Sequence, residues 1–268
     1  MTVYAVLNQK GGVGKTTLAL NLADAWACQG LSVLLVDVDK QAAATCSLVA
    51  WEDEGYNTLA DVLRGDDGDL ATAIYGTDPQ WGDEKTPFEV VPAALALEDV
   101  WASQSPGLVF RLRRALAKQS GASPRGALLD YDRIILDGPP DLGPGTVSAA
   151  VAADHVIVPT RPERMSMHGV SRTVEMVNLI RRDMAPNLNL AAIIPVAVDG
   201  RLTEHKARVV ELQAAYGDTV TEPIPHRLRS DEASGYAVPG RSLPGSAGEA
   251  LGSAYRALAV ELDRRVAK

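Results

Sequence analysis

Between Val3 and Gly30 a glycine-rich loop separates a strand from a helix, and this order constrains the fold more than any other feature of the sequence. VYAVLN is a short apolar run rich in β-branched and aromatic residues, which is typical of a buried strand. After QKGGVG, apolar residues recur at helical spacing from Lys15 to Gly30, a suitable residue for a helix end. LSVLLVDVD is a second buried strand, so the segment predicts a β-α-β unit with parallel strands.

Later segments continue this alternation. Further apolar strands are expected at Arg133–Pro140, His155–Thr160 and Leu190–Val198. Helical periodicity covers Thr146–Ala153, Ser166–Met184, Thr203–Tyr216 and Ser246–Val266. The pattern predicts an α/β fold, a mostly parallel twisted sheet with helices on both faces. Trp51–Leu129 is less regular, with one possible strand at Phe88–Ala93 and a basic amphipathic helix at Val109–Gln119. Because no linker interrupts the chain, residues 1–268 are expected to form a single domain.

Composition removes several classes of protein. The 268 residues are 46% hydrophobic, which suits a large folded core and not a disordered chain. No apolar run approaches the roughly 20 residues of a membrane span, and the N-terminus lacks the features of a signal peptide, so a cytoplasmic protein is expected. Cys28 and Cys46 are too few for a disulfide framework or a metal cluster of their own.

The charge is unevenly distributed along the chain. The net charge of −8 argues weakly against nucleic-acid binding. The first 160 residues hold 11 basic and 21 acidic residues, whereas the remainder holds 15 basic and 13 acidic residues. A basic patch could therefore lie on the C-terminal part without showing in the total.

The glycine loop predicts a phosphate-binding site. Glycines allow backbone N–H groups to surround phosphate oxygens, and the following helix N-terminus favours negative charge. Lys15 is expected to reach the β- and γ-phosphates, and the Thr16 hydroxyl to bind Mg²⁺. The strict pattern G-x-x-x-x-G-K-[ST] is not fully met, since Gln9 occupies its first glycine position. The nucleotide-binding residues are expected to be Gly11, Gly12, Val13, Gly14, Lys15, Thr16 and Thr17.

The same stretch contains a second lysine. KGGVGKTT resembles the deviant Walker A motif, KGGxGKT[ST], of the ParA/MinD family of P-loop ATPases. This resemblance implies that Lys10 reaches across an ATP-dependent homodimer to the partner's nucleotide, as an arginine finger does. Without the resemblance, Lys10 would be interpreted as a solvated loop lysine.

Two further motifs resemble those of this family. LLVDVDKQAAAT is similar to its DxDPQ(G)(N)AT segment, which implies that Asp39 orients the attacking water and that Asp37 lies nearer the metal. The sequence departs from the pattern with Lys40 in place of proline, and with Ala42–Ala43 in place of glycine and a small polar residue. YDRIILDGPPDLG resembles the hhhhDxPPxLG segment, which implies that Asp137 holds Mg²⁺ through water and that Gly138–Pro140 form a switch loop.

The resemblance extends over nearly the whole chain. VDGRLTEHKARVVELQ and IPHRLRSDEASGYAVP look like the family's late segments, in which a loop near adenine contributes arginines to nonspecific DNA binding in the ParA branch. Arg229 matches the family arginine best, Arg227 could compensate for His226, and Pro225 is expected to border the base. Arg201 completes the expected DNA-binding residues. Other arginines and lysines could enlarge the patch, or could simply form a solvated face: Arg181, Arg182, Lys206, Arg208 and Arg241.

The function implied is ATP-dependent DNA partition by a nucleoid-associated ATPase. ATP and Mg²⁺ would be its cofactors, hydrolysis would be weak, and a ParB-like centromere-binding protein would stimulate it and release the DNA. A MinD-like protein on a membrane is an alternative, although the tail ALGSAYRALAVELDRRVAK lacks Phe and Trp. A cargo-positioning ATPase is a second alternative. A relative of the nitrogenase iron protein would need cysteines after the Asp137 and His155 strands, and neither cysteine falls there.

Overall fold

A seven-stranded sheet forms the centre of the molecule, in the order β3-β4-β2-β5-β1-β6-β7. This computed structural model describes residues 1–49, 55–78, 80–81, 88–103, 105, 107–117, 131–226 and 238–267. The strands are β1 (Thr2–Val6), β2 (Val33–Asp37), β3 (Tyr75–Gly76), β4 (Glu89–Val91), β5 (Arg133–Asp137), β6 (His155–Thr160) and β7 (Asn189–Pro195). Neighbouring strands are parallel, except that β3 runs antiparallel to β4. The predicted α/β fold with a mostly parallel sheet is confirmed.

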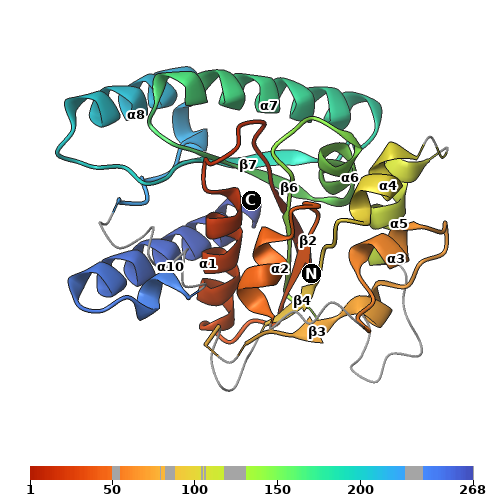
Figure 1. Ribbon diagram of the computed structural model, residues 1–268. Coiled ribbons are helices and arrows are strands. Elements are labelled where there is room, and N and C mark those ends of the chain that lie inside the picture. The colour runs from red at the N-terminus through yellow and green to blue at the C-terminus, as the bar shows by residue number, and fades with distance from the viewer. Residues whose placement is uncertain are drawn as a thin grey trace.

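Helices cover both faces of this sheet (Figure 1). One face packs against α1 (Lys15–Ala27), α2 (Ala43–Leu48) and α10 (Ser246–Val266). The other packs against α3 (Leu59–Leu63), α4 (Leu97–Ala102), α5 (Arg111–Ala117), α6 (Pro144–Ala152), α7 (Arg164–Asp183) and α8 (Thr203–Tyr216). Four short 3₁₀ turns complete the described elements: η1 (Leu70–Ala73), η2 (Leu108–Phe110), η4 (Gly217–Thr219) and η5 (Gly240–Ser242).

The alternation of side chains along β1 explains why its sequence is apolar throughout. Val3 and Ala5 belong to the hydrophobic core on one face, whereas Tyr4 and Val6 belong to the core on the other. Tyr4 stacks on Trp26 of α1 with ring centroids 5.1 Å apart. A strand buried on both faces has no position for a solvated side chain, so it lacks the polar alternation of a one-sided sheet.

The carboxyl ends of four central strands meet at one edge of the sheet. Val6 at the end of β1 is paired with Asp137 of β5 and with Ile157 of β6, and Asp37 of β2 is paired with Asp137. The loops that follow β1, β2, β5 and β6 are therefore neighbours, although they are far apart in sequence. In open α/β sheets this edge is where ligands bind.

Two sequence-level expectations can be compared directly with the described residues. Neither Cys28 nor Cys46 forms a disulfide. None of the described helices is both long enough and apolar enough to cross a membrane.

Candidate functional site

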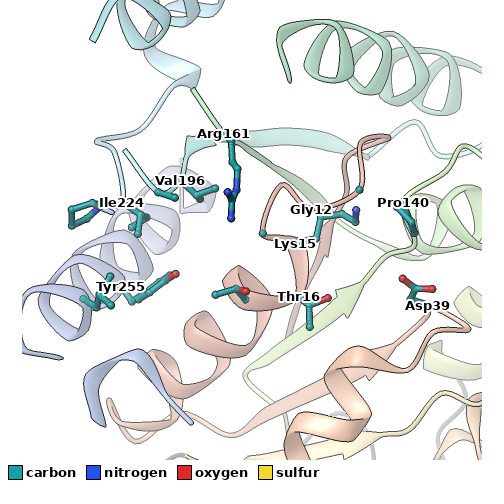
Figure 2. A pocket seen from close by; sticks show the side chains of 15 residues that line it. Gly12, Lys15, Thr16, Asp39, Pro140, Arg161, Val196, Ile224 and Tyr255 are labelled. Carbon is teal, nitrogen blue, oxygen red and sulfur yellow. The ribbon is translucent and has the colours of Figure 1, made fainter. Parts of the chain in front are cut away.

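A cavity of about 400 Å³ lies at this carboxyl edge. Figure 2 shows Ile224 and Tyr255 at one end, Gly12, Lys15 and Thr16 in the middle, and Pro140 and Asp39 at the other end. The remaining lining residues are Gly11, Gly14, Thr17, Arg161, Val196, Ala197, Pro225 and Leu251. The cavity thus runs from an apolar end, past a glycine loop and a lysine, to a carboxylate.

The glycine loop has the backbone that its sequence predicts. Gly12 and Gly14 have φ angles of 71° and 87°, in the left-handed region that side chains disfavour. Lys15 begins α1 and is buried, and its Nζ donates a hydrogen bond to the Lys10 carbonyl at 3.2 Å. Burial lowers the pKa of Lys15, against the opposing charge of Asp137. The Val13 side chain is buried in the protein and does not line the cavity.

Asp37 organises the loop that presents Asp39. Its Oδ2 accepts hydrogen bonds from the Thr45 backbone N–H at 2.9 Å and from the Thr45 hydroxyl at 2.8 Å. Its Oδ1 accepts from the Asp39 backbone N–H at 3.1 Å. Burial raises the pKa of Asp37 to about 6, and these hydrogen bonds act in the opposite direction. Both oxygens of the carboxylate expected nearer the metal are therefore occupied by protein donors, whereas Asp39 itself lines the cavity.

Asp137 is a buried carboxylate with unused acceptor capacity. Its side chain is 1% exposed, and neither Oδ1 nor Oδ2 has a hydrogen-bond partner among the described residues. Burial and the neighbouring Asp37 raise the pKa of Asp137 well above its usual range, although the nearby Thr16 hydroxyl and the charge of Lys15 oppose them. Such an orphaned pair of oxygens fits a hard cation, which prefers carboxylate and hydroxyl ligands. Within the described residues, no group of three or more His, Cys, Asp or Glu side chains could hold a metal ion.

The turn after Asp137 passes close to the end of β1, where Gly138 leaves room for the Leu7 side chain. A Cβ at Gly138 would lie 2.3 Å from Leu7 Cδ2 and 3.2 Å from the Val6 carbonyl oxygen. The Gly138 N–H also donates to that carbonyl at 3.2 Å. The loop that carries Pro140 to the cavity is thereby fixed against the end of β1.

The departures from the family pattern after Asp39 have structural consequences. Ala42 caps α2 with φ 54° and ψ 33°, a left-handed conformation that glycine adopts without strain. Lys40 Nζ lies 2.6 Å from Glu98 Oε1 on α4, so this loop contacts a helix from the other face of the sheet.

Lys10 is bound by its own chain. Its Nζ lies 2.8 Å from Glu163 Oε2 and 3.0 Å from Ser166 Oγ, at the start of α7. The Lys10 hydrogen bond is the main cause that lowers the pKa of Glu163. Lys10 does not line the cavity, unlike Lys15.

The apolar end of the cavity comes from segments that the motifs did not identify. Pro225 lines it as expected, together with Val196, Ala197 and Ile224 after β7, and with Leu251 and Tyr255 of α10. Arg161, directly after β6, also escaped the sequence analysis. Its place after a strand end was a usable signal, because the carboxyl edge carries the ligand site. Tyr255 gave no such signal, since an aromatic residue in an amphipathic helix is usually a core residue.

The expected DNA-binding residues are only partly described. Arg227 and Arg229 lie outside the described residues. Arg201 is highly exposed, but it donates to both carboxylate oxygens of Asp199, at 3.0 and 2.7 Å. The Arg201 guanidinium and its hydrogen bonds lower the pKa of Asp199 below its usual range. Among the other cations of the expected patch, Arg182 pairs in the same way with Asp183.

Arg241 belongs to an internal contact and not to a surface patch. Its Nε and Nη2 donate to the buried Asp24 carboxylate of α1 at 2.7 and 2.9 Å. The Gly240 N–H donates to Asn21 Oδ1 at 2.8 Å, which also attaches η5 to α1. At the other side of the 227–237 segment, the His226 N–H donates to the Val198 carbonyl at 2.9 Å. The residues on both sides of that segment are therefore attached to two elements that also supply lining residues of the cavity, the chain after β7 and helix α1.

Known proteins resemble this chain in sequence over most of its length. A family model described as "AAA domain" matches residues 1–190. The chain is 33% identical to the chromosome-partitioning ATPase Soj of Thermus thermophilus over 264 residues, which covers 98% of this chain and 95% of that protein. It is 31% identical to the chromosome partitioning protein ParA of Caulobacter vibrioides over 246 residues, 89% of this chain and 86% of that protein.

Solved structures share the fold. A Mycobacterium smegmatis protein described as cobyrinic acid a,c-diamide synthase, with bound ADP and magnesium, superposes with a TM-score of 0.79 and 30% identity, covering 100% of this chain and 96% of that one. The ATP complex of a variant of Cyanothece McdA gives a TM-score of 0.81 at 19% identity, covering 98% and 96% of the two chains, and this match concerns the fold alone.

Proposed function

Because the chain belongs to the ParA/Soj family of chromosome-partitioning ATPases, we propose that it is an ATP-dependent DNA partition protein. The proposed reaction is attack of water on the γ-phosphate of ATP, which yields ADP and phosphate. ATP drives a homodimer that binds DNA without sequence preference. A ParB-like centromere-binding protein stimulates hydrolysis and so releases the DNA.

The order of residues along the cavity carries this proposal. Ile224, Pro225 and Tyr255 form an apolar end that suits an adenine base. The loop from Gly11 to Thr17 and the Lys15 ammonium occupy the place of the phosphates. Asp39 lies at the far end, where the terminal phosphate and the attacking water belong (Figure 2). A nucleoside triphosphate matches this sequence of apolar, cationic and acidic surroundings.

Thr16 and Asp137 are the residues that fit Mg²⁺. The Asp137 carboxylate supplies oxygens that accept no well-formed hydrogen bond from the described residues, and the Thr16 hydroxyl lies near it at the phosphate loop. Asp37 is paired with Asp137 in the sheet, and its oxygens accept hydrogen bonds from Thr45 and Asp39. When bound, Mg²⁺ would neutralise charge that develops on the phosphate oxygens. It would arrive with the nucleotide, since magnesium sites commonly use one or two protein carboxylates plus phosphate.

Asp39 is proposed to orient the attacking water. It lines the acidic end of the cavity, and its Oδ1 accepts the Gln41 N–H at 3.0 Å, which fixes the carboxylate in the turn. The backbone of Asp39 is in turn held by Asp37. Removal of the Asp39 carboxylate is therefore expected to slow hydrolysis and to leave the phosphate-binding loop intact.

Lys10 is proposed to act on the partner's nucleotide in the dimer. A cation aimed at the transferred phosphoryl group stabilises its charge in the transition state. In the single chain Lys10 is bound instead to Glu163 and Ser166. Dimerisation would therefore exchange this contact for one with the partner's nucleotide.

DNA binding is proposed to depend on arginines after Pro225. Arg227 and Arg229 are the residues that the sequence supports, with Arg201 as a weaker contributor because Asp199 already neutralises it. Contacts from arginine to phosphate carry no sequence information and weaken steeply with salt. In the cell, this protein would associate with the nucleoid.

Co-sedimentation with nonspecific duplex DNA tests the proposal. The protein is compared with ATP, with ADP and without nucleotide, at two salt concentrations, and dimerisation is followed in parallel by light scattering. ATP-dependent, salt-sensitive binding is expected. Lys15→Ala, which removes the phosphate contact, should abolish it, whereas exposed Arg172→Ala should not. A dimer that forms with ATP but does not bind DNA would overturn the DNA role and would favour a membrane or protein surface as the track.

A further inference from the structure

Arg161 places a guanidinium inside the cavity without a hydrogen-bond or salt-bridge partner among the described residues. It directly follows β6, whose Thr160 pairs with Pro195 of β7, so its backbone is fixed by the sheet. Its Nε is buried and has no hydrogen-bond partner among the described residues. No described carboxylate forms a salt bridge with it either. A buried N–H without a partner is rare in a folded protein and calls for a ligand.

The nearby acid is already engaged. Glu163 lies two positions along the chain, and the charge of Arg161 helps to lower its pKa, but its carboxylate is bound to Lys10 at 2.8 Å. Among the described residues that line the cavity, Asp39 is the only acid, and Figure 2 shows it at the other end, beyond the phosphate loop. The Arg161 guanidinium is therefore available to bind an anionic group of a ligand in the cavity.

The position of Arg161 identifies the part of the ligand that it meets. Figure 2 shows its side chain pointing into the cavity between the apolar end, marked by Val196, Ile224 and Tyr255, and the phosphate loop at Gly12. Lys15 serves the β- and γ-phosphates, on the far side of that loop from the base. The group between the base and the β-phosphate is the ribose with its α-phosphate, and only the phosphate is an anion.

We infer that Arg161 binds a non-bridging oxygen of the nucleotide's α-phosphate within the same chain. This inference rests on the proposal that the cavity binds ATP. It makes Arg161 a second cationic phosphate ligand besides Lys15, and one that does not distinguish ATP from ADP, since both carry an α-phosphate. Arginine suits this place because its planar guanidinium donates several hydrogen bonds in a fixed geometry.

The test measures nucleotide affinity by calorimetry for wild type, Arg161→Ala and Arg161→Lys, with Arg172→Ala on the exposed side of α7 as the charge-matched control. Because Arg161→Ala loses a hydrogen bond to a charged group, its affinities for ATP and for ADP are expected to fall by the same factor, about 10- to 100-fold. Lysine should restore part of the affinity, and the control should bind as wild type does. Equal thermal unfolding of the nucleotide-free variants would show that the fold is unchanged.

A second measurement separates contact from local distortion. The two diastereomers of adenosine 5′-O-(1-thiotriphosphate) replace one or the other non-bridging α-oxygen with sulfur. Wild type and Arg172→Ala should discriminate between them, and Arg161→Ala should lose most of this discrimination. Unchanged affinity in Arg161→Ala, a loss confined to ATP, or undiminished discrimination would each overturn the inference. If wild type bound no adenine nucleotide at all, the proposed function would fail instead.

Discussion

Lys10 Nζ lies 2.8 Å from Glu163 Oε2 of the same chain, so the lysine that resembles a trans-acting group is held in cis. Ser166 Oγ adds a third atom to the contact at 3.0 Å. The two charged side chains are about one-third and one-half exposed, and partly exposed pairs of this kind contribute only about 0.2–1 kcal/mol. The free energy needed to release Lys10 from Glu163 is therefore small, and contacts formed in the dimer can offset it.

Glu163→Gln should raise the unstimulated rate of ATP hydrolysis about two- to fivefold, because it weakens the ion pair that keeps Lys10 from reaching the partner's nucleotide. Phosphate release measured over a range of protein concentrations would show this as a higher turnover of the dimer. Glu175→Gln, on an exposed position of α7, is the matched control. In the double variant with Lys10→Ala the gain should disappear; a gain that persists there would assign Glu163 a role independent of Lys10.

Asp39→Asn should lower partner-stimulated turnover about 100-fold and retain ATP binding, because the amide keeps the size of the side chain but orients water poorly. Its Oδ1 can still accept the Gln41 N–H, so the turn is preserved. The ATP dimer should accumulate on DNA and persist after excess ADP is added, as followed by light scattering and co-sedimentation. Normal turnover in this variant would remove Asp39 from the reaction.

Ala42→Gly should raise the free energy of unfolding by about 1 kcal/mol, since the left-handed backbone at φ 54° strains alanine and not glycine. The adjacent Ala43 provides the control with the opposite sign, because it is the exposed first residue of α2 and Gly there weakens a helix. Urea unfolding of the nucleotide-free variants gives both values. A loss of stability in Ala42→Gly would contradict the left-handed assignment.

Arg229→Glu should weaken DNA binding and leave ATP-driven dimerisation unchanged, because it removes one phosphate contact and adds a repulsive charge. The slope of log affinity against log salt should fall by about one. Arg201→Ala should have a smaller effect, since Asp199 already neutralises that guanidinium. If Arg201→Ala were the more damaging variant, the binding surface would have to lie around α8.

The strands and helices were predictable where hydrophobic periodicity is strong. The final helix begins at Ser246, directly after Gly245, and ends at Val266, as its apolar spacing predicts. The two-residue strand β3 was not predicted, since a strand this short leaves no periodic signal. Thr16 and Asp39 line the cavity. Both were predicted, because each belongs to a contiguous sequence motif that directly follows a strand.

Other contacts join residues that are too distant in sequence to be linked by a motif. Arg241 was grouped with surface cations, but its partner Asp24 lies 217 residues earlier, and only the fold brings the two together. Arg161 has no distinguishing neighbour in sequence, so its role depends on which cavity its strand end faces. Tyr255 reaches the apolar end of that cavity because α10 packs beside α1, which periodicity alone does not specify.

The chain on both sides of the 227–237 segment is attached to elements that also line the cavity, and this has a thermodynamic consequence. Arg227 and Arg229 lie between His226, bound to Val198, and the η5 turn, bound to α1, the helix that begins at Lys15. Two ligands that bind through one connected set of elements are linked, and linkage is reciprocal. Any factor by which ATP raises the affinity for DNA must equal the factor by which DNA raises the affinity for ATP. The nucleoid would therefore be an allosteric effector of the nucleotide site, as well as the surface to which the protein binds.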